Sequence, residues 1–389
     1  MDWVADRRTF LAASGGALAG CLNGEEDEPE PEPTPHEDRE PLSSEWPTFS
    51  RDEMNTGYEP GISGPYTEIQ EQWQFETESS IVASPAIAGN TLYVGGTNGT
   101  LYALDPYVGA EIWSFETDGV LSSTPTIVDE TVYIGSGDHH VYALDAREGT
   151  EEWRFDTAGR VDASPTVVDD TVYVGSVSNA LVAIDRESGT QRWRFDTGGS
   201  VFSTPAVADE TVYVGSSDQR VYAIHAETGD RQWSYRTNGI IAGGPAIADG
   251  VVYAGSRDGH VYALDAEDGD SLWRYSVNGA IHGSPAITEG MLFVGSNDDY
   301  LYAIGIGGDE PADMWRFQTQ GSVTASPAAT GNHVFAASMS GNVFAIVPRS
   351  GETVWRFEVD SEIQEGPAVS EDWLYFGTTD GIVYAINSA

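Results

Sequence analysis

The 389-residue sequence contains no lysine, so all 18 of its basic residues are arginine. Against 62 Asp and Glu residues they leave a formal net charge of −44. Nucleic acid is therefore excluded as an expected partner, because phosphate binding needs basic patches. A chain this acidic repels itself unless salt screens the charges, and the Debye length falls to roughly 3 Å at 1 M salt. We therefore expect a protein that works in high salt.

Cysteine is nearly absent, and Cys21 alone cannot form an intrachain disulfide. The pair Arg7-Arg8 resembles a twin-arginine export signal, and Leu18-Ala19-Gly20-Cys21 resembles a lipobox. The apolar stretch between them is too short to span a bilayer. We expect residues 1–21 to be a signal peptide and Cys21 to carry a lipid that anchors the protein on the extracytoplasmic face of the cell membrane. The alternative is a buried helix over residues 9–21 with Cys21 in a core.

Residues 22–45 lack a regular apolar pattern and contain ten acidic residues, one arginine and a Glu-Pro repeat. Prolines cannot join a sheet ladder and like charges repel, so this segment is predicted to be a disordered, semi-rigid spacer. The acidity of the whole chain also argues against direct contact with an anionic membrane surface. The membrane is therefore expected to be reached through the lipid anchor only.

The rest of the chain is dominated by a repeat whose marker is a tryptophan. Successive copies lie 40 residues apart except once, where the spacing is 42. The eight copies are Trp73, Trp113, Trp153, Trp193, Trp233, Trp273, Trp315 and Trp355. A period of about 40 residues with several short strands and no helix is typical of a β-propeller blade. We predict an all-β, eight-bladed propeller over residues 71–389, after a lead-in over residues 46–70.

One copy shows the predicted strands of a blade. They cover 162–168, 172–176, 181–185 and 191–195, and glycine or polar turns separate them. The chain starts its repeats with a lone fourth strand at 71–75. It ends them with three strands at 363–369, 374–377 and 382–386. The two ends should therefore complete one blade together and leave no open sheet edge.

The tryptophans recur in the frame Ala-x-Asp-x-x-x-Gly-x-x-x-Trp, as in Ala143 to Trp153. This frame puts one indole at a fixed place on every outer strand, with small Ala and Gly residues near it. We interpret all eight as structural residues that dock one blade on the next. An aromatic ligand box is the alternative for these residues.

The run from Asp258 to Asp265, Asp-Gly-His-Val-Tyr-Ala-Leu-Asp, resembles the repeat of pyrroloquinoline-quinone (PQQ)-type propellers. The lead-in from Trp46 to Tyr58 resembles the segment before the propeller in BamB-like members of that superfamily. The acidic, lysine-free composition and the export signal resemble those of secreted lipoproteins of salt-loving archaea. The resemblance implies either a scaffold that binds protein partners or a quinoprotein dehydrogenase with PQQ and calcium on the propeller axis.

Two departures from the family favour the scaffold. The dehydrogenases typically carry an adjacent Cys-Cys disulfide against the quinone, and this propeller has no cysteine. They are also longer, whereas these blades are near-minimal, with one two-residue insertion around 305–313. We expect a non-catalytic module with no cofactor and unidentified protein partners. A PQQ- and calcium-dependent dehydrogenase of alcohols or sugars is kept as the alternative.

Function should lie where the copies differ. The residue three positions before each repeat proline follows a uniform Ile, Leu or Val, yet it varies from acid to aromatic to imidazole. We expect this variable column to surround the mouth of the central channel. It comprises Val82, Ser122, Asp162, Phe202, Ala242, His282, Thr324 and Gln364.

The best candidates for a binding site are four residues of that column, the glutamate beside its last member, and basic residues of nearby loops. They are Asp162, Phe202, His282, Gln364, Glu365, Arg160, His140 and His260. A small polar or anionic ligand, or a loop of a partner, would bind there; a solvated rim without function is the alternative. Metal sites at His139-His140 and Asn297-Asp298-Asp299 are not expected, because no further ligands occur at suitable spacing.

Overall fold

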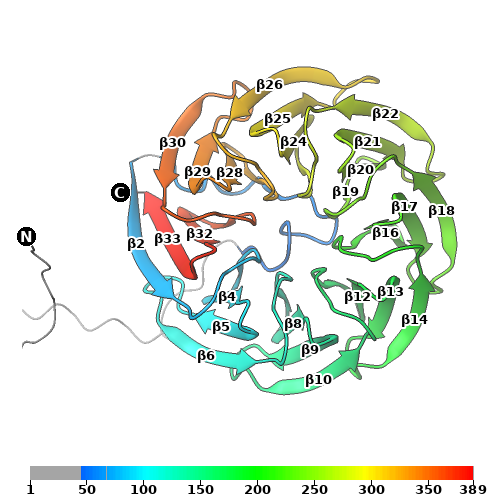
Figure 1. The fold of residues 1–389 in the computed structure, drawn as a ribbon, viewed down its shortest axis with the longest axis horizontal. Coiled ribbons are helices and arrows are strands. Elements are labelled where there is room, and N and C mark those ends of the chain that lie inside the picture. Colours follow the sequence, from blue (N-terminus) through cyan, green and yellow to red (C-terminus); the bar gives the residue numbers. More distant parts are fainter. Residues whose placement is uncertain (1–44, 67, 389) are drawn as a thin grey trace, which may run out of the picture. The chain divides into compact units, whose positions relative to one another are not determined.

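The computed structural model describes residues 45–66 and 68–388, which form eight small sheets arranged as a ring around a central channel (Figure 1). No helix occurs within these two ranges, and so none of their elements is a helix able to cross a membrane. This confirms the predicted eight-bladed propeller. The predictions for Arg7, Arg8, Cys21 and the spacer up to residue 44 lie outside the described residues.

Each blade has four antiparallel strands that run from the channel outward. The innermost strands are β3 (Ala86–Ala88), β7 (Thr126–Val128), β11 (Thr166–Val168), β15 (Ala206–Ala208), β19 (Ala246–Ala248), β23 (Ala286–Thr288), β27 (Ala328–Thr330) and β31 (Ala368–Ser370). The second strands are β4 (Thr91–Gly95), β8 (Thr131–Gly135), β12 (Thr171–Ser176), β16 (Thr211–Ser216), β20 (Val251–Ser256), β24 (Met291–Ser296), β28 (Val334–Ser338) and β32 (Trp373–Gly377).

The third strands are β5 (Thr100–Leu104), β9 (His140–Asp145), β13 (Ala180–Asp185), β17 (Arg220–His225), β21 (His260–Asp265), β25 (Tyr300–Gly305), β29 (Asn342–Ile346) and β33 (Ile382–Ser388). The outer strands are β6 (Glu111–Glu116), β10 (Glu151–Asp156), β14 (Gln191–Asp196), β18 (Arg231–Arg236), β22 (Ser271–Ser276), β26 (Ala312–Gln318), β30 (Thr353–Glu358) and β2 (Ile69–Glu76). We number the blades 1 to 8 in the order of their innermost strands.

The burial of the strands follows their composition. The second and third strands are apolar without alternation and are buried along most of their length, because neighbouring blades cover both faces. In seven of the eight blades a glycine near the end of the second strand allows this close approach, and blade 7 has Ala337 there. A Cβ on Gly175 would lie 2.3 Å from Cγ1 of Val201 in the next blade. The outer strands are mostly exposed and bury mainly their tryptophan.

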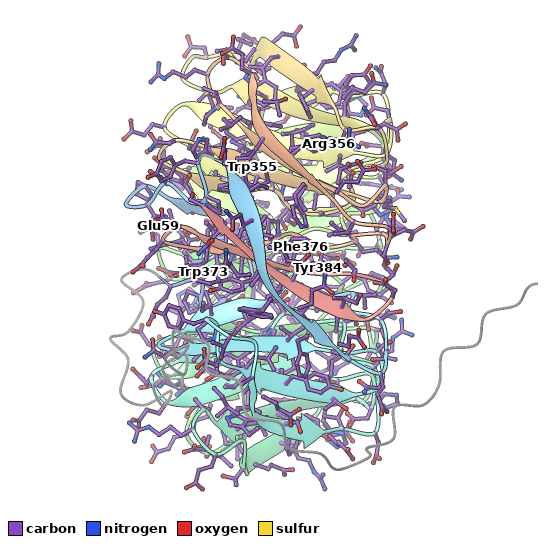
Figure 2. The ribbon with its side chains drawn as sticks, turned by 90° about the vertical axis from the view of Figure 1, so that its left-hand side faces the viewer. Glu59, Trp355, Arg356, Trp373, Phe376 and Tyr384 are labelled. Atoms are coloured by element: carbon purple, nitrogen blue, oxygen red, sulfur yellow. The ribbon has the colours of Figure 1, made fainter. Side chains whose placement is uncertain are left out.

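The ring is closed as predicted, by the two ends of the chain. Strand β2 pairs antiparallel with β33, from Ile69 opposite Ser388 to Glu76 opposite Ile382. Figure 2 shows the two strands side by side at the edge of the ring. This pairing completes blade 8 and leaves no third strand without an outer neighbour.

The innermost strands are shorter than predicted. Residues 162–168 were expected to form one strand, but β11 covers only 166–168. Pro165 has no N–H for a ladder hydrogen bond, and Ser164 uses its hydroxyl to accept a hydrogen bond from the Thr124 amide at 2.9 Å. The predicted strand at 363–369 is likewise reduced to β31. The residues before each strand therefore form irregular backbone that lines the channel.

The lead-in segment 45–66 runs inside the ring along the free edges of the innermost strands (Figure 1). Its short strand β1 (Tyr58–Glu59) pairs in parallel with β27. Its carbonyl groups accept backbone hydrogen bonds of 2.7 to 3.0 Å from six blades. The donors are the amides of Ile87, Ile127, Val207, Ile247, Ile287 and Ala329. The lead-in thus satisfies groups that would otherwise be unpaired inside the channel.

The tryptophans lie where neighbouring blades meet. Seven of them donate an indole N–H···O bond of 2.7 to 3.0 Å to a backbone carbonyl 33 residues ahead or, for Trp355, to Pro65 of the lead-in. Six cover a glycine of the next blade so closely that a Cβ there would clash. The pairs are Trp73 with Gly109, Trp113 with Gly149, Trp153 with Gly189, Trp193 with Gly229, Trp233 with Gly269 and Trp315 with Gly351.

Trp273 is the exception. Its partner loop in blade 6 contains the two-residue insertion, and within residues 45–66 and 68–388 its indole N–H donates no hydrogen bond. It still packs on Tyr253 of its own blade, with ring centroids 5.7 Å apart.

Candidate functional site

A cavity of about 580 Å³ lies at one mouth of the channel, and we call it the mouth cavity. Its walls come from the irregular backbone before the innermost strands and from loops that join second to third strands. The lead-in contributes Phe49 to its lining. The cavity is therefore bounded by the ring and by the segment that runs through the ring.

All eight residues of the variable column line the mouth cavity. They are Val82, Ser122, Asp162, Phe202, Ala242, His282, Thr324 and Gln364. Arg160 and Glu365 also line it, so the structure brings six of the eight candidate residues together. His140 and His260 are not among the lining residues.

Arg160 and Asp162 form an ion pair on the blade 3 side of the cavity. Arg160 Nη2 lies 2.9 Å from Asp162 Oδ2, and Ser122 Oγ donates to Asp162 Oδ1 at 3.0 Å. The Arg160 side chain is 54% exposed, so the pair stabilises the fold only weakly. Asp162 therefore lines the cavity as the acidic half of an ion pair.

His282 lies on the blade 6 side of the cavity. The Asn297 side-chain amide donates to its Nε2 at 3.2 Å, so this nitrogen acts as the acceptor. Burial lowers the pKa of His282 below its usual 6.5, and the positive charge of Arg257 lowers it further. Near neutral pH this imidazole is uncharged, and Arg257 is the exposed cation of that wall.

Glu365 lies on the blade 8 side, and its carboxyl group meets no compensating group. Burial alone raises its pKa from 4.5 to about 8. Its side chain keeps partial exposure, and that exposure is to the cavity. Throughout the described part of the chain, no group donates a hydrogen bond or contributes a positive charge to it. At pH 7 most molecules therefore carry this group protonated.

His140 and His260 lie at the starts of the third strands β9 and β21. Each ring Nδ1 lies 3.1 to 3.2 Å from oxygens of the aspartate two residues earlier, Asp138 or Asp258. These aspartates also accept a hydrogen bond from a tyrosine of the same blade, at 2.7 Å in both cases. The repeated aspartate is thus a turn residue that orders the hairpin, and the histidines belong to that turn.

The sequence reasoning missed the role of the lead-in. Asn55 is fully buried, has φ 55°, and its Nδ2 donates to the carbonyl oxygens of Thr204, Pro205 and Pro245 at 3.1 to 3.3 Å. It therefore ties the lead-in to blades 4 and 5. No pattern around Asn55 signals this, because its partners are backbone atoms about 150 to 190 positions away.

A second cavity of about 570 Å³ lies between the lead-in and the innermost strands of blades 2 and 3. Arg51 and Glu59 form an ion pair at its edge, within the lead-in. Asp52 accepts a hydrogen bond from the Thr56 amide at 2.9 Å and another from the Thr56 hydroxyl. Burial raises the pKa of Asp52. These contacts stabilise the turn that the lead-in makes between Arg51 and Glu59.

The mouth cavity does not have the cluster of carboxylates expected around calcium. Calcium takes six to eight oxygen ligands. The carboxylates of the lining, Asp162 and Glu365, lie on blades 3 and 8, and Asp162 is paired with Arg160. In the described ranges, His, Cys, Asp and Glu form no group of three that could hold a metal ion. We derive no chemistry through a quinone at this site.

Comparison with known proteins gives matches along most of the chain. The model of a family described as outer membrane protein assembly factor BamB matches residues 70–164, 137–241, 237–307 and 309–389. No curated protein sequence matches the chain.

Several solved structures share the fold. The crystal structure of BamB from Moraxella catarrhalis has a TM-score of 0.71 at 20% identity and covers 82% of this chain and 100% of its own. The quinohemoprotein alcohol dehydrogenase from Comamonas testosteroni has a TM-score of 0.77 at 16% identity, covering 88% of this chain and 80% of its own. A europium-containing methanol dehydrogenase reaches 0.76 at 14% identity, covering 88% of this chain and 98% of its own. At these identities the likeness concerns the fold alone.

Proposed function

Because the chain belongs to the family of outer membrane protein assembly factor BamB, we propose that it is a non-catalytic scaffold that binds a partner protein at the mouth cavity. One observation carries the proposal: all eight positions of the variable column line this cavity. The residues that the eight copies share are used for strand pairing and blade docking. What differs among the copies is gathered where a partner could reach it.

The proposed setting is the outer face of a cell membrane. Twin-arginine export and a lipid on Cys21 would place the propeller there, and the acidic spacer would hold it away from the surface. With a net charge of −44, the protein is suited to a salt-rich exterior where its own repulsion is screened. Binding to nucleic acid or directly to an anionic bilayer is not part of this proposal.

The proposal is tested by capture from detergent-solubilised native membranes in high salt. We expect the wild-type protein to retain a partner and the double variant Asp162→Ala/His282→Ala to retain at least tenfold less. His140→Ala is the matched control, because His140 begins strand β9, bonds to the turn residue Asp138 and does not line the cavity. Equal capture by all three proteins would place binding elsewhere.

The second candidate is a PQQ- and calcium-dependent dehydrogenase, for which the fold of the quinohemoprotein alcohol dehydrogenase is the supporting observation. The same protein, incubated with PQQ and calcium in high salt, decides between the two. Stoichiometric appearance of the quinone absorbance, with dye reduction by alcohols or sugars, would replace the scaffold proposal. We expect neither.

A further inference from the structure

Glu365 occupies a position where the other seven blades have a small residue. The equivalents, which directly precede the Ser, Thr or Gly before each repeat proline, are Ala83, Ser123, Ala163, Ser203, Gly243, Gly283 and Ala325. The five that have a side chain are at most 3% exposed. Ser123 and Ser203 turn their hydroxyls back onto a glycine backbone of the same blade, at 2.8 to 3.0 Å. The fold therefore needs only a small residue here.

The glutamate is also held in place by its neighbour. A Cβ on Gly366 would lie 2.2 Å from the carbonyl oxygen of Ser326 in blade 7, so this residue must be glycine. The backbone of Glu365 is thus fixed against the adjacent blade, and its side chain lines the mouth cavity. A large carboxyl group at a position that packing fills with Ala, Ser or Gly points to a role outside folding.

Among the residues that the structure describes, no cation neutralises this carboxyl group. The other charged and titratable groups that line the cavity are Arg160, Asp162, Arg257 and His282. Arg160 is paired with Asp162, and His282 with Arg257 occupies the wall of blades 5 and 6. Burial is the one influence on the Glu365 pKa, so none of these charges reaches it. A buried carboxylate without a partner is costly, and a cation from outside would remove that cost.

We propose that the mouth cavity binds an organic cation, an alkylammonium or alkylguanidinium group, with the Glu365 carboxylate as its counterion. The blades on either side add apolar surface for an alkyl stem, with Val82 in blade 1 and Met339 in blade 7. A single carboxylate suits a cation of charge one, whereas a divalent metal needs more oxygen ligands. The strongly negative protein also attracts cations and repels anions. This inference rests on the proposed function of the cavity.

The test is calorimetric titration of the full chain with n-butylammonium and n-butylguanidinium at pH 7, in buffers of different ionisation enthalpy. We expect binding with release of close to one proton per cation. The reason is that a carboxyl group with a pKa of about 8 is mostly protonated at pH 7 and must ionise to hold the cation. Apparent affinity should rise about fivefold from pH 7 to pH 8 and level off above pH 9. His282, with its pKa lowered, does not titrate above pH 7.

Glu365→Gln should lower the affinity more than tenfold and abolish the proton release. Glu362→Gln is the matched control, because that exposed carboxylate lies three residues earlier in the same segment. Glu365→Ala reproduces the residue of blades 1, 3 and 7 and guards against a folding defect in the glutamine variant. Tighter binding of butyrate, binding without proton release, or unchanged binding by both Glu365 variants would overturn the inference.

The cation could be a free metabolite or a side chain of the partner, and a glycine pentapeptide with one central lysine separates these sources. Tighter binding of the peptide than of n-butylammonium favours a partner side chain, and weaker binding favours a free cation. Failure of this inference is distinct from failure of the proposed function. If the partner is captured equally by wild type and Glu365→Gln, the cavity still binds a partner but Glu365 is not its contact.

Discussion

A single buried amide fixes the lead-in inside the ring. Asn55 presents an NH₂ group to three carbonyl oxygens and tolerates a positive φ. Asn55→Asp keeps the shape and this backbone preference but points a carboxylate at the same carbonyls. We expect the free energy of unfolding to fall by about 3 kcal/mol, since a buried charge would be left without donors. Denaturant unfolding in high salt measures the effect.

The control for this change is Asn278→Asp. Asn278 is exposed, and the equivalent residue four blades earlier in the repeat, Asp118, is already aspartate. Its unfolding midpoint should stay at the wild-type value. If Asn55→Asp also left the midpoint unchanged, the lead-in would contribute little to the stability of the ring.

At the scale of one strand, two tryptophans differ in whether their indole N–H donates a hydrogen bond to the next blade. This difference allows the contribution of that hydrogen bond to stability to be measured. Trp193 and Trp273 are 8% and 9% exposed on equivalent outer strands, but only Trp193 donates its N–H to the next blade, to Ala226 at 2.8 Å. Replacement by phenylalanine makes the same change of shape at both sites and removes a hydrogen bond at one. We expect Trp193→Phe to lower the free energy of unfolding by about 1 to 2 kcal/mol more than Trp273→Phe does.

Thermal or denaturant unfolding of the two variants gives this difference directly. The comparison holds because the residues lie in different blade contacts and share no partner. Equal losses would mean that the indole N–H contributes nothing beyond the packing of its ring.

The blades could be predicted from the sequence because their signals are local and repeated. The second and third strands at 172–176 and 181–185 differ from β12 and β13 by one residue at their starts, since apolar runs and glycine turns define them. The predicted start of the innermost strand was wrong. A proline there has no N–H for the sheet ladder, and a side-chain hydroxyl accepts a hydrogen bond from the backbone of the neighbouring blade instead.

Only part of the candidate site, likewise, could be predicted from the sequence. The variable column could be found because a fixed period places equivalent residues at equivalent places around a ring, so Asp162, Phe202 and His282 all reach the mouth cavity. His140 and His260 do not reach it, because each bonds to its own turn aspartate. The contribution of Phe49 could not be predicted, because the path of the lead-in depends on backbone hydrogen bonds to many distant strands.

At the scale of the whole molecule, the last blade of the ring is completed by one pair of strands from opposite ends of the chain. Seven blades take all four strands from one continuous stretch, whereas blade 8 joins β2 to β33 across more than 300 residues. Closing so long a loop costs conformational entropy, and the β2–β33 pair is the strand pairing that closes it. The β2–β33 pair is therefore the natural place for the ring to open.

A disulfide across that pair should stabilise the whole propeller. Gln70 and Asn387 are register partners near the surface, and antiparallel partners lie within the reach of a disulfide. In a Cys21→Ser background, we expect oxidised Gln70→Cys/Asn387→Cys to unfold at a clearly higher temperature than its reduced form. The chain-entropy estimate for a loop this long is about 6 kcal/mol, an upper value because strain reduces it. Melting with and without reductant measures it, and Cys21→Ser alone should not respond to reductant. Equal melting temperatures for the bonded and reduced forms would contradict the expected stabilisation by closure of this loop.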